Sequence, residues 1–480
     1  MNDMILILNY SDEFSMEIAR RLRAEQIYSR IVSGSMSAAQ ICELAPRGII
    51  LSGEAASSNG VFDACILELG IPVLALGHAA HMLLAAQGGA CADAAISKRK
   101  ANIEYGESLL FDGLTDGERY LEEALMLMLP PDVKMTASAA GCTIAFEHNE
   151  KKQYGVQFEL ERNDPEGSAV LKNFARMICG CSGWWSLDAA LREAELRLEK
   201  VASQGGSALC AVSGGVDSAV SALLAYRAFG ERMTAIFVDT GLMREDEAAD
   251  IQNTFEELGV PLLCVDRSGE VLEALMNKRG NEEKRNVVTR ILHEEMIRQS
   301  ASLSGEKVLV LGTNYSDFLN TGSSVQSWEE SGMLVIEPLL ELFKEEVRAI
   351  AARLGFEESI VSRKPFPALG LGARILGEVT GERLHALRTA ESIFSEEISE
   401  AGLERKLYKY FPILVGGDTA VGNEMIILRA VTLSGGQLMP ARLPYDLVER
   451  TVERIMEKSP SIARVFYDET PTPVGKETFS

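Results

Sequence analysis

The sequence lacks the features of several large classes of protein. No apolar segment approaches the ~18 residues that a membrane-spanning helix requires, so membrane insertion is not expected. Positive charge is scarce, since 47 lysines and arginines stand against 70 aspartates and glutamates and give a net charge of −23. No basic run is long enough to offset this charge locally, so nucleic-acid binding is not expected either.

Paired cysteines are also missing. The eight cysteines are scattered and contain no C-x-x-C motif, which argues against a secreted disulfide framework. Cys179 and Cys181 are the only close pair, and one intervening residue is too few for the usual zinc spacing. The first apolar run, MILIL, has acidic residues on both sides and no basic segment before it, so it predicts a strand rather than a signal peptide. We therefore expect reduced thiols and a cytoplasmic protein.

The chain is long enough for about three domains of about 150 residues each. In two parts of the chain, short strands that are apolar throughout alternate with amphipathic, helix-like stretches. The strands expected in the first part are 4–8, 48–53, 71–77, 142–148 and 154–161, with helices at 14–24, 60–70 and 78–87. Those expected in the second part are 208–212, 234–239, 261–266 and 307–312. Such alternation is typical of parallel sheets covered on both faces by helices.

The pattern changes from about residue 371. A long charged helix is expected at 379–400, a strand at 424–434, a helix at 445–458 and a strand at 463–469. The predicted fold class is therefore α/β, with two doubly wound parallel-sheet domains and a small α+β C-terminal domain. The predicted domains are 1–185, 186–370 and 371–480.

The strongest chemical motif is SGGVDS, which spans Ser213 to Ser218 between a buried strand and an Ala/Leu-rich helix. Two glycines let the backbone close on an anion, and the helix N-terminus directs N–H groups at it. The two serines can add hydroxyl donors. Asp217 would repel a bare phosphate, so we expect it to hold a Mg²⁺ ion that bridges phosphates. No lysine follows the glycines, which excludes the Walker A loop.

This motif resembles the phosphate loop of the ATP pyrophosphatase (PP-loop) family. Further blocks resemble successive blocks of the GMP synthases within it, and in order they are 237–275, 312–322, 336–355, 364–379 and 441–455. The resemblance covers nearly the whole chain. It implies an amidotransferase domain, an ATP pyrophosphatase domain and a C-terminal dimerising domain, and hence a homodimer. The implied reaction uses ATP and Mg²⁺ to adenylylate the C2 oxygen of XMP, after which ammonia displaces AMP.

The predicted site residues follow from the motif, from the resemblance and from the rule that open α/β sheets bind ligands at the carboxyl ends of their strands. Those expected to bind ATP are Ser213, Gly214, Gly215, Val216, Asp217, Ser218, Val238, Asp239, Gly241, Gly312 and Thr313. Asp317 and Lys344 are expected at the phosphates. Arg285 and Lys364 are expected to contact the acceptor substrate.

The first domain departs from its family at the catalytic positions. Alignment of IPVLALGHAAH places Gly77 where the family has its cysteine nucleophile. Alignment of GVQFELE places Glu159 at the histidine and Glu161 at the glutamate. A thioester cannot form without a thiol, so we predict that this domain does not hydrolyse glutamine. The ammonia would then come from solution or from a separate glutaminase subunit.

His78 and His81 offer a metal site as an alternative, because residues three apart can share a helix face. Only Glu159 and Glu161 could be a third ligand, so we favour two ordinary helix-face histidines.

The acceptor side is also altered. The family's HHNVGG loop is replaced by 323–333, Lys364 replaces a histidine, and the tail 472–480 loses a lysine and a glutamate. XMP stays the default acceptor. Two alternatives stay open: amidation or thiolation of another purine or heterocycle, with Cys264 as the sulfur candidate, and a non-catalytic partner protein. A complete SGGVDS loop with Asp217 argues against the last.

Overall fold

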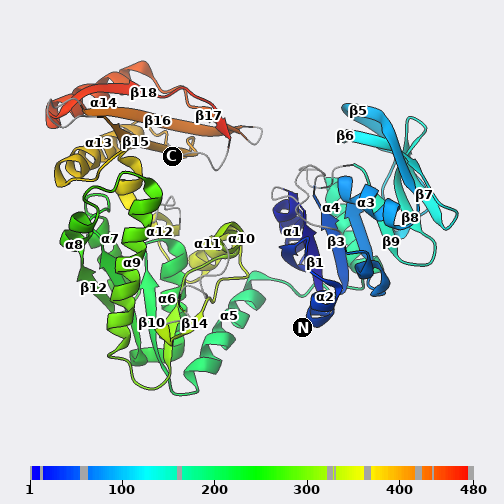
Figure 1. Cartoon of the computed structure of the whole chain (residues 1–480), viewed down its shortest axis with the longest axis horizontal. Coiled ribbons are helices and arrows are strands. Elements are labelled where there is room, and N and C mark those ends of the chain that lie inside the picture. Colours follow the sequence, from blue (N-terminus) through cyan, green and yellow to red (C-terminus); the bar gives the residue numbers. More distant parts are fainter. Residues whose placement is uncertain are drawn as a thin grey trace. The chain divides into compact units, whose positions relative to one another are not determined.

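The computed structural model of the chain is shown in Figure 1. It describes residues 3–10, 14–53, 63–158, 160, 165–321, 328, 331–361, 369–416, 424–434 and 437–473. The chain forms two compact units, Met1–Ala190 and Leu191–Ser480. Within the described residues, no helix combines the length and apolarity that crossing a membrane requires.

The first unit is built on one nine-stranded sheet with the order β2-β1-β3-β4-β9-β8-β7-β5-β6. Its strands are β1 (Met4–Asn9), β2 (Tyr28–Ser33), β3 (Gly48–Ser52), β4 (Val73–Leu76), β5 (Ala90–Tyr105), β6 (Gly117–Met128), β7 (Val133–Ala139), β8 (Cys142–His148) and β9 (Gln153–Val156). Its helices are α1 (Phe14–Ala24), α2 (Ala38–Leu44), α3 (His78–Ala86) and α4 (Pro165–Asn173), with shorter turns η2 (Ala64–Glu68), η3 (Leu109–Phe111) and η4 (Phe174–Ile178).

The parallel half of this sheet confirms the expectation of a doubly wound core. Strands β2, β1, β3, β4 and β9 pair in parallel. Leu6 and Leu8 of β1 pack in one cluster with α2 and α3, while Ile5 and Ile7 on the opposite face are equally buried. Strands that are covered on both faces need apolar residues at every position, which is why these runs could be recognised in the sequence.

The antiparallel arrangement of the other half of the sheet was not predicted. Strands β8, β7, β5 and β6 are antiparallel to their neighbours, and β5 and β6 form a long hairpin that is visible in Figure 1. The strand expected at 142–148 is confirmed as β8, whereas the strand expected at 154–161 ends at Val156. The helix expected at 60–70 is wrong, because the described part of that stretch forms only the short 3₁₀ turn η2.

The second unit contains a five-stranded parallel sheet with the order β12-β11-β10-β13-β14. Its strands are β10 (Ser207–Val212), β11 (Met233–Asp239), β12 (Leu262–Asp266), β13 (Lys307–Val310) and β14 (Leu334–Ile336), so all four predicted strands are confirmed. The helices of this part are α5 (Leu187–Ala202), α6 (Val216–Phe229), α7 (Glu247–Glu257), α8 (Ser268–Ala274), α9 (Asn281–Ser300), α10 (Tyr315–Thr321), α11 (Lys344–Arg353) and α12 (Glu358–Val361), with turns η5 (Gly230–Arg232) and η7 (Gly370–Arg374).

The C-terminal part of this unit carries a third sheet, with the order β15-β16-β17-β19 and β18 paired to β16. Its elements are α13 (Gly381–Glu400), β15 (Lys409–Val415), β16 (Glu424–Ser434), β17 (Gln437–Pro440), α14 (Tyr445–Lys458), β18 (Ile462–Tyr467) and β19 (Thr472–Pro473). Phe394 of α13 and Ile455 of α14 share one buried cluster with Leu414, Ile426 and Leu428 of the sheet. This mixed sheet with two helices confirms the predicted α+β architecture.

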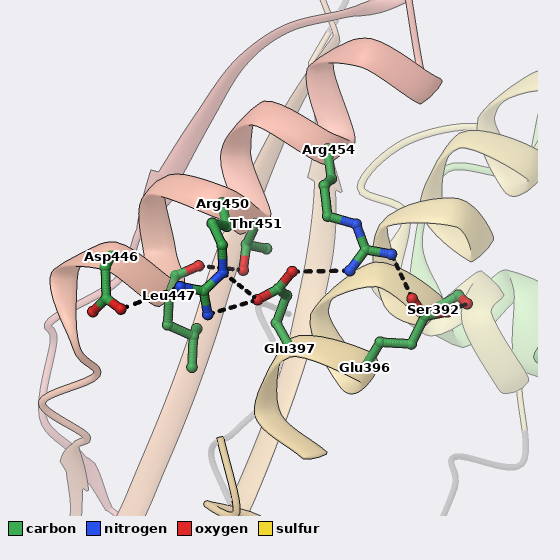
Figure 2. Close-up of polar contacts among 8 residues, drawn as sticks. All are labelled: Ser392, Glu396, Glu397, Asp446, Leu447, Arg450, Thr451 and Arg454. Atoms are coloured by element: carbon green, nitrogen blue, oxygen red, sulfur yellow. Dashed lines mark hydrogen bonds and ion pairs between the residues drawn. The ribbon is translucent and has the colours of Figure 1, made fainter. Parts of the chain in front are cut away.

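A buried carboxylate joins the two helices of this part (Figure 2). Glu397 of α13 is only 3% exposed, and it accepts hydrogen bonds from Arg450 (3.0 Å) and Arg454 (2.9 Å) of α14. The neighbouring Glu396 also pairs with Arg454, but 52% of its side chain is exposed. Water competes for an exposed ion pair far more than for a buried one. Glu397 is therefore expected to stabilise the packing of α13 on α14 more than Glu396 does.

Replacement of Glu397 by alanine should therefore lower the free energy of unfolding by about 2 kcal/mol, since two charge-assisted hydrogen bonds are lost. Glu396→Ala is the matched control, and its loss should stay below about 1 kcal/mol. Urea unfolding of the two variants beside the unchanged chain measures both values. Equal losses would contradict the dominance of the buried carboxylate.

Candidate active site

The SGGVDS loop forms the turn between β10 and α6. Gly214 has a φ of +83°, a conformation that favours glycine. The Ser218 hydroxyl accepts hydrogen bonds from the backbone N–H and the hydroxyl of Ser213, both at 3.2 Å, and donates to the Gly215 carbonyl at 2.9 Å. Both serines were expected to offer hydroxyl donors to a phosphate. In the structure their hydroxyl hydrogens bond within the loop, so their first role is to fix its shape.

Asp217 lies in the first turn of α6, and its side chain is 14% exposed. The Lys344 ammonium, at the start of α11, is 3.6 Å from its Oδ2. Burial raises the pKa of Asp217, the charge of Lys344 opposes that shift, and the nearby Asp317 adds to it. Among the described residues, the buried Oδ1 has no hydrogen-bond partner. A buried carboxylate oxygen left in this state, beside a phosphate-binding loop, fits a divalent cation such as Mg²⁺.

The exit of β13 lies against the same loop. At Gly312 a Cβ would come within 2.8 Å of the backbone N and Cα of Ser218, so only glycine fits between the two chain segments. Thr313 follows, and Asn314 is fully buried. The Asn314 Oδ1 accepts the backbone N–H of Asp317 at 3.0 Å and so caps α10.

Asn314 was missed in the sequence analysis. Its amide lies close enough to Asp217 to favour the ionised carboxylate, which makes it a neighbour of the predicted metal position. An asparagine directly before a predicted helix is a capping signal, and that signal could have drawn attention to it.

The turn after β11 completes this edge of the sheet. The Asp239 Oδ1 accepts the backbone N–H of Gly241 at 2.8 Å, and Gly241 has a φ of +71°. Val238, at the end of the strand, is nearly buried. Because β11, β10 and β13 are neighbours in the sheet, their carboxyl ends bring the ATP-binding residues predicted from three distant segments to one edge.

On the acceptor side, the structure separates the basic pair at the start of α9. Arg285 is exposed, whereas Lys284 is fully buried and donates to the carbonyls of Ile375 (2.6 Å) and Gly372 (3.3 Å). Lys284 therefore holds η7 against α9. Lys364, most of 323–333 and the tail from 474 lie outside the described residues.

Lys284 should give the protein a measurable pH dependence. Burial, and next the charge of Arg383, lowers its pKa from 10.5 to about 8. Between about pH 8 and 10.5 the unfolded chain binds a proton that the folded chain releases, so the free energy of unfolding rises with pH there. The slope should reach up to about 1.4 kcal/mol per pH unit and should be absent in Lys284→Met.

Urea unfolding of both proteins from pH 7.5 to about 9.5 measures this difference. Lys406→Met, at an exposed position of the same unit, serves as the control and should keep the slope of the unchanged chain. A slope that survives in Lys284→Met would assign the titration to another group.

The turn predicted to have lost its nucleophile lies between β4 and α3 of the first unit. Gly77 joins β4 to α3 with φ +57° and ψ −125°, and a Cβ there would meet nothing within 4 Å. The turn has room for a side chain, but its backbone conformation suits glycine. Glu159 and Glu161, expected at the other two catalytic positions, lie outside the described residues.

The two histidines beside this turn contact each other, with 3.4 Å between their Nδ1 atoms. The His81 Nε2 lies 2.7 Å from the Gln157 Oε1, and both amide hydrogens of Gln157 are directed to the carbonyls of Leu125 and Thr143. Nε2 of His81 must therefore carry the hydrogen. Within the described part of the chain, no group of three or more metal-binding side chains occurs.

The cysteines named above are also placed by the structure. Cys264, the sulfur candidate, lies in the middle of β12, opposite Phe237. That placement is two residues away from the sheet edge where the ATP-binding residues are predicted, and it weakens the case for a sulfur-transfer role. Cys179 and Cys181 are free, buried thiols, and burial raises the pKa of Cys181 to about 12.

Comparison with known proteins matches both parts of the chain. Residues 6–178 match the model of the class-I glutamine amidotransferases, and residues 192–374 match that of the NAD synthases. Proteins named GMP synthase [glutamine-hydrolyzing] from Geobacillus kaustophilus and Bacillus pumilus are each 35% identical, over 510 and 508 residues. The protein of that name from Halothermothrix orenii is 36% identical over 507 residues. Each alignment covers 98% of both proteins.

Proposed function

Because the chain belongs to the GMP synthase family of ATP-dependent ligases, we propose that it adenylylates an oxo group and replaces it with ammonia. The default acceptor is the C2 oxo group of XMP, and the products are GMP, AMP and pyrophosphate. The chain itself does not hydrolyse glutamine. The observation that carries this last point is Gly77, a residue without a side chain at the turn where the family has its nucleophile.

The chemistry needs two steps. In the first, the acceptor oxygen attacks the α-phosphorus of ATP, and the bond between that phosphorus and the bridging oxygen of pyrophosphate breaks. In the second, ammonia attacks the carbon that bears the new ester, AMP leaves with the oxygen, and the nitrogen loses a proton. An oxo group is a poor leaving group, whereas AMP is a good one, so ATP is consumed to make the exchange possible.

The described residues support the first step. The Ser213–Ser218 loop surrounds the departing pyrophosphate with backbone N–H groups at the start of α6. Lys344 neutralises negative charge that develops on the phosphates, and its 3.6 Å separation from Asp217 keeps it at the loop. Asp217 would hold Mg²⁺, which would supply charge neutralisation when bound. A chain that had lost catalysis would have no need of a buried carboxylate at this position.

The test measures AMP and pyrophosphate release with ATP, Mg²⁺ and XMP, and compares ammonium with glutamine as nitrogen donor. We expect turnover with ammonium and none with glutamine, while a glutamine-hydrolysing relative serves as the positive control. Turnover with glutamine would show that the alignment of Gly77 with the nucleophile is wrong. No XMP-dependent turnover with either donor would shift the proposal to a different acceptor.

A different acceptor is the second candidate, because Lys364 and the altered segments 323–333 and 472–480 all fall on the acceptor side. A panel of oxo-purine nucleotides and bases, tested with ammonium under the same conditions, separates the two. Cys264→Ser tests thiolation, since unchanged turnover with ammonia would remove that reading.

We also propose a homodimer, to be checked by light scattering, and a supply of ammonia from solution or from a separate glutaminase subunit.

A further inference from the structure

A helix outside the nucleotide-binding part of the chain holds the turn that follows β11. We call residues 239–244 the nucleotide turn. Arg388 of α13 donates from Nη2 to the Gly241 carbonyl (2.8 Å) and from Nε to the Met243 carbonyl (3.0 Å). These residues are 147 and 145 positions apart in the sequence. The planar guanidinium fits two carbonyls at once, which a lysine cannot do.

The same helix makes a second contact with the nucleotide turn. Glu391, only 4% exposed, accepts from the Nε of Arg244 at 2.8 Å and from the Nη1 of Arg374 in η7 at 2.8 Å. From the other side, the carbonyl of the fully buried Leu242 accepts the backbone N–H of Leu371 at 2.8 Å. The nucleotide turn is therefore fixed at Gly241, Leu242 and the two residues that follow.

These hydrogen bonds hold residues that are predicted to bind ATP. Gly241 donates its N–H to the Asp239 carboxylate and presents its carbonyl to Arg388, so both ends of this one residue are engaged. A displacement of Gly241 would change the hydrogen bond that orients Asp239. Arg388 thus acts on the residues assigned to ATP through the backbone of the nucleotide turn.

We propose that Arg388 is a positioning residue of the ATP site, and that α13 is consequently a structural part of that site. This inference rests on the proposed function of the 213–241 region. The stretch that matches the NAD synthases ends at residue 374, before α13 begins. The nucleotide turn is therefore ordered by a helix that also packs on α14 through Glu396 and Glu397 (Figure 2).

The experiment compares Arg388→Ala with a matched variant on the same helix. Arg383 likewise donates to backbone carbonyls, those of Leu376 (3.0 Å) and Gly416 (2.8 Å), but neither belongs to the nucleotide turn. Mg·ATP affinity is measured by calorimetry, and hydrogen exchange is measured over peptides that cover 239–247. The affinity measurement needs no acceptor, so it does not depend on the identity of that substrate.

Arg388→Ala should weaken Mg·ATP binding about tenfold, because binding must then order a turn that was previously fixed. It should also accelerate exchange in 239–247, and ATP should reverse that acceleration. Arg388→Lys, which keeps one donor group, should recover part of the affinity. Arg383→Ala should lower the melting temperature but leave Mg·ATP affinity unchanged at temperatures where the protein is folded.

Unchanged affinity and exchange in Arg388→Ala would overturn the inference, as would a loss of thermal stability alone that matches Arg383→Ala. In either case the proposed function stands as long as the parent chain binds Mg·ATP and its turnover depends on Asp217. Failure of the parent chain to bind Mg·ATP is a different result, which overturns the proposed function and this inference with it.

Discussion

Replacement of Asp217 by asparagine should lower ATP-dependent AMP release by roughly a thousandfold, because the site loses the charge that we propose to hold its metal. The change is isosteric and gives up the 3.6 Å ion pair of Oδ2 with Lys344, whereas the buried Oδ1 has no hydrogen-bond partner among the described residues. Burial already opposes ionisation of this group and raises its pKa. The neutral amide should therefore leave the melting temperature unchanged or slightly higher. Turnover with saturating substrates and a thermal melt together measure the effect.

The raised pKa of Asp217 also predicts how Mg·ATP binding changes with pH. Protonation removes the charge that is proposed to hold Mg²⁺, so binding of Mg·ATP should weaken as the pH falls, and it should do so above the ordinary carboxyl pKa of 3.8. Glu231→Gln, an exposed acidic residue just after α6, is the control and should change neither turnover nor this profile. Turnover in Asp217→Asn close to that of the parent chain would place the nucleotide phosphates elsewhere.

The elements that could be predicted from sequence are those whose own residue pattern indicates their secondary structure. β3 and β10 are apolar along their length because neighbours cover both faces, and their boundaries agree with the prediction closely. β6 reads GERYLEEALMLM, a composition rich in helix-forming residues. Pairing with β5, not local preference, makes it a strand, and a single sequence does not display that pairing.

The residues of the candidate site likewise divide into those that could be predicted from the sequence and those that could not. SGGVDS could be recognised because strand, glycines, carboxylate and helix follow one another directly in the chain. The contacts of Arg388 with the nucleotide turn span 147 residues, and nothing near Arg388 in the sequence distinguishes it from a solvated helix arginine. Lys284 was not predicted either, since it directly precedes Arg285, the predicted substrate contact, yet it is fully buried while Arg285 is exposed.

Replacement of Gly312 by alanine should disrupt the proposed ATP site through the backbone of the neighbouring loop. The added Cβ would lie 2.8 Å from the backbone N and Cα of Ser218 and 3.0 Å from the carbonyl carbon of Asp217. These are main-chain atoms of the first turn of α6, which cannot rotate away as a side chain can. We expect a loss of about 2 kcal/mol in the free energy of unfolding and at least about a hundredfold loss in Mg·ATP-dependent turnover.

The matched control is Gly269→Ala, in α8 of the same unit, where a Cβ would meet nothing within 4 Å. That change removes glycine from a helix and should stabilise the protein slightly, with turnover unchanged. If Gly312→Ala loses stability but keeps its turnover, the loop has moved without loss of function, and phosphate binding does not depend on the close contact between β13 and α6. If it keeps both stability and turnover, β13 and α6 leave room for a Cβ at position 312, which contradicts the 2.8 Å separation from Ser218. Only the combined loss identifies the contact as the one that sets the loop's geometry for ATP.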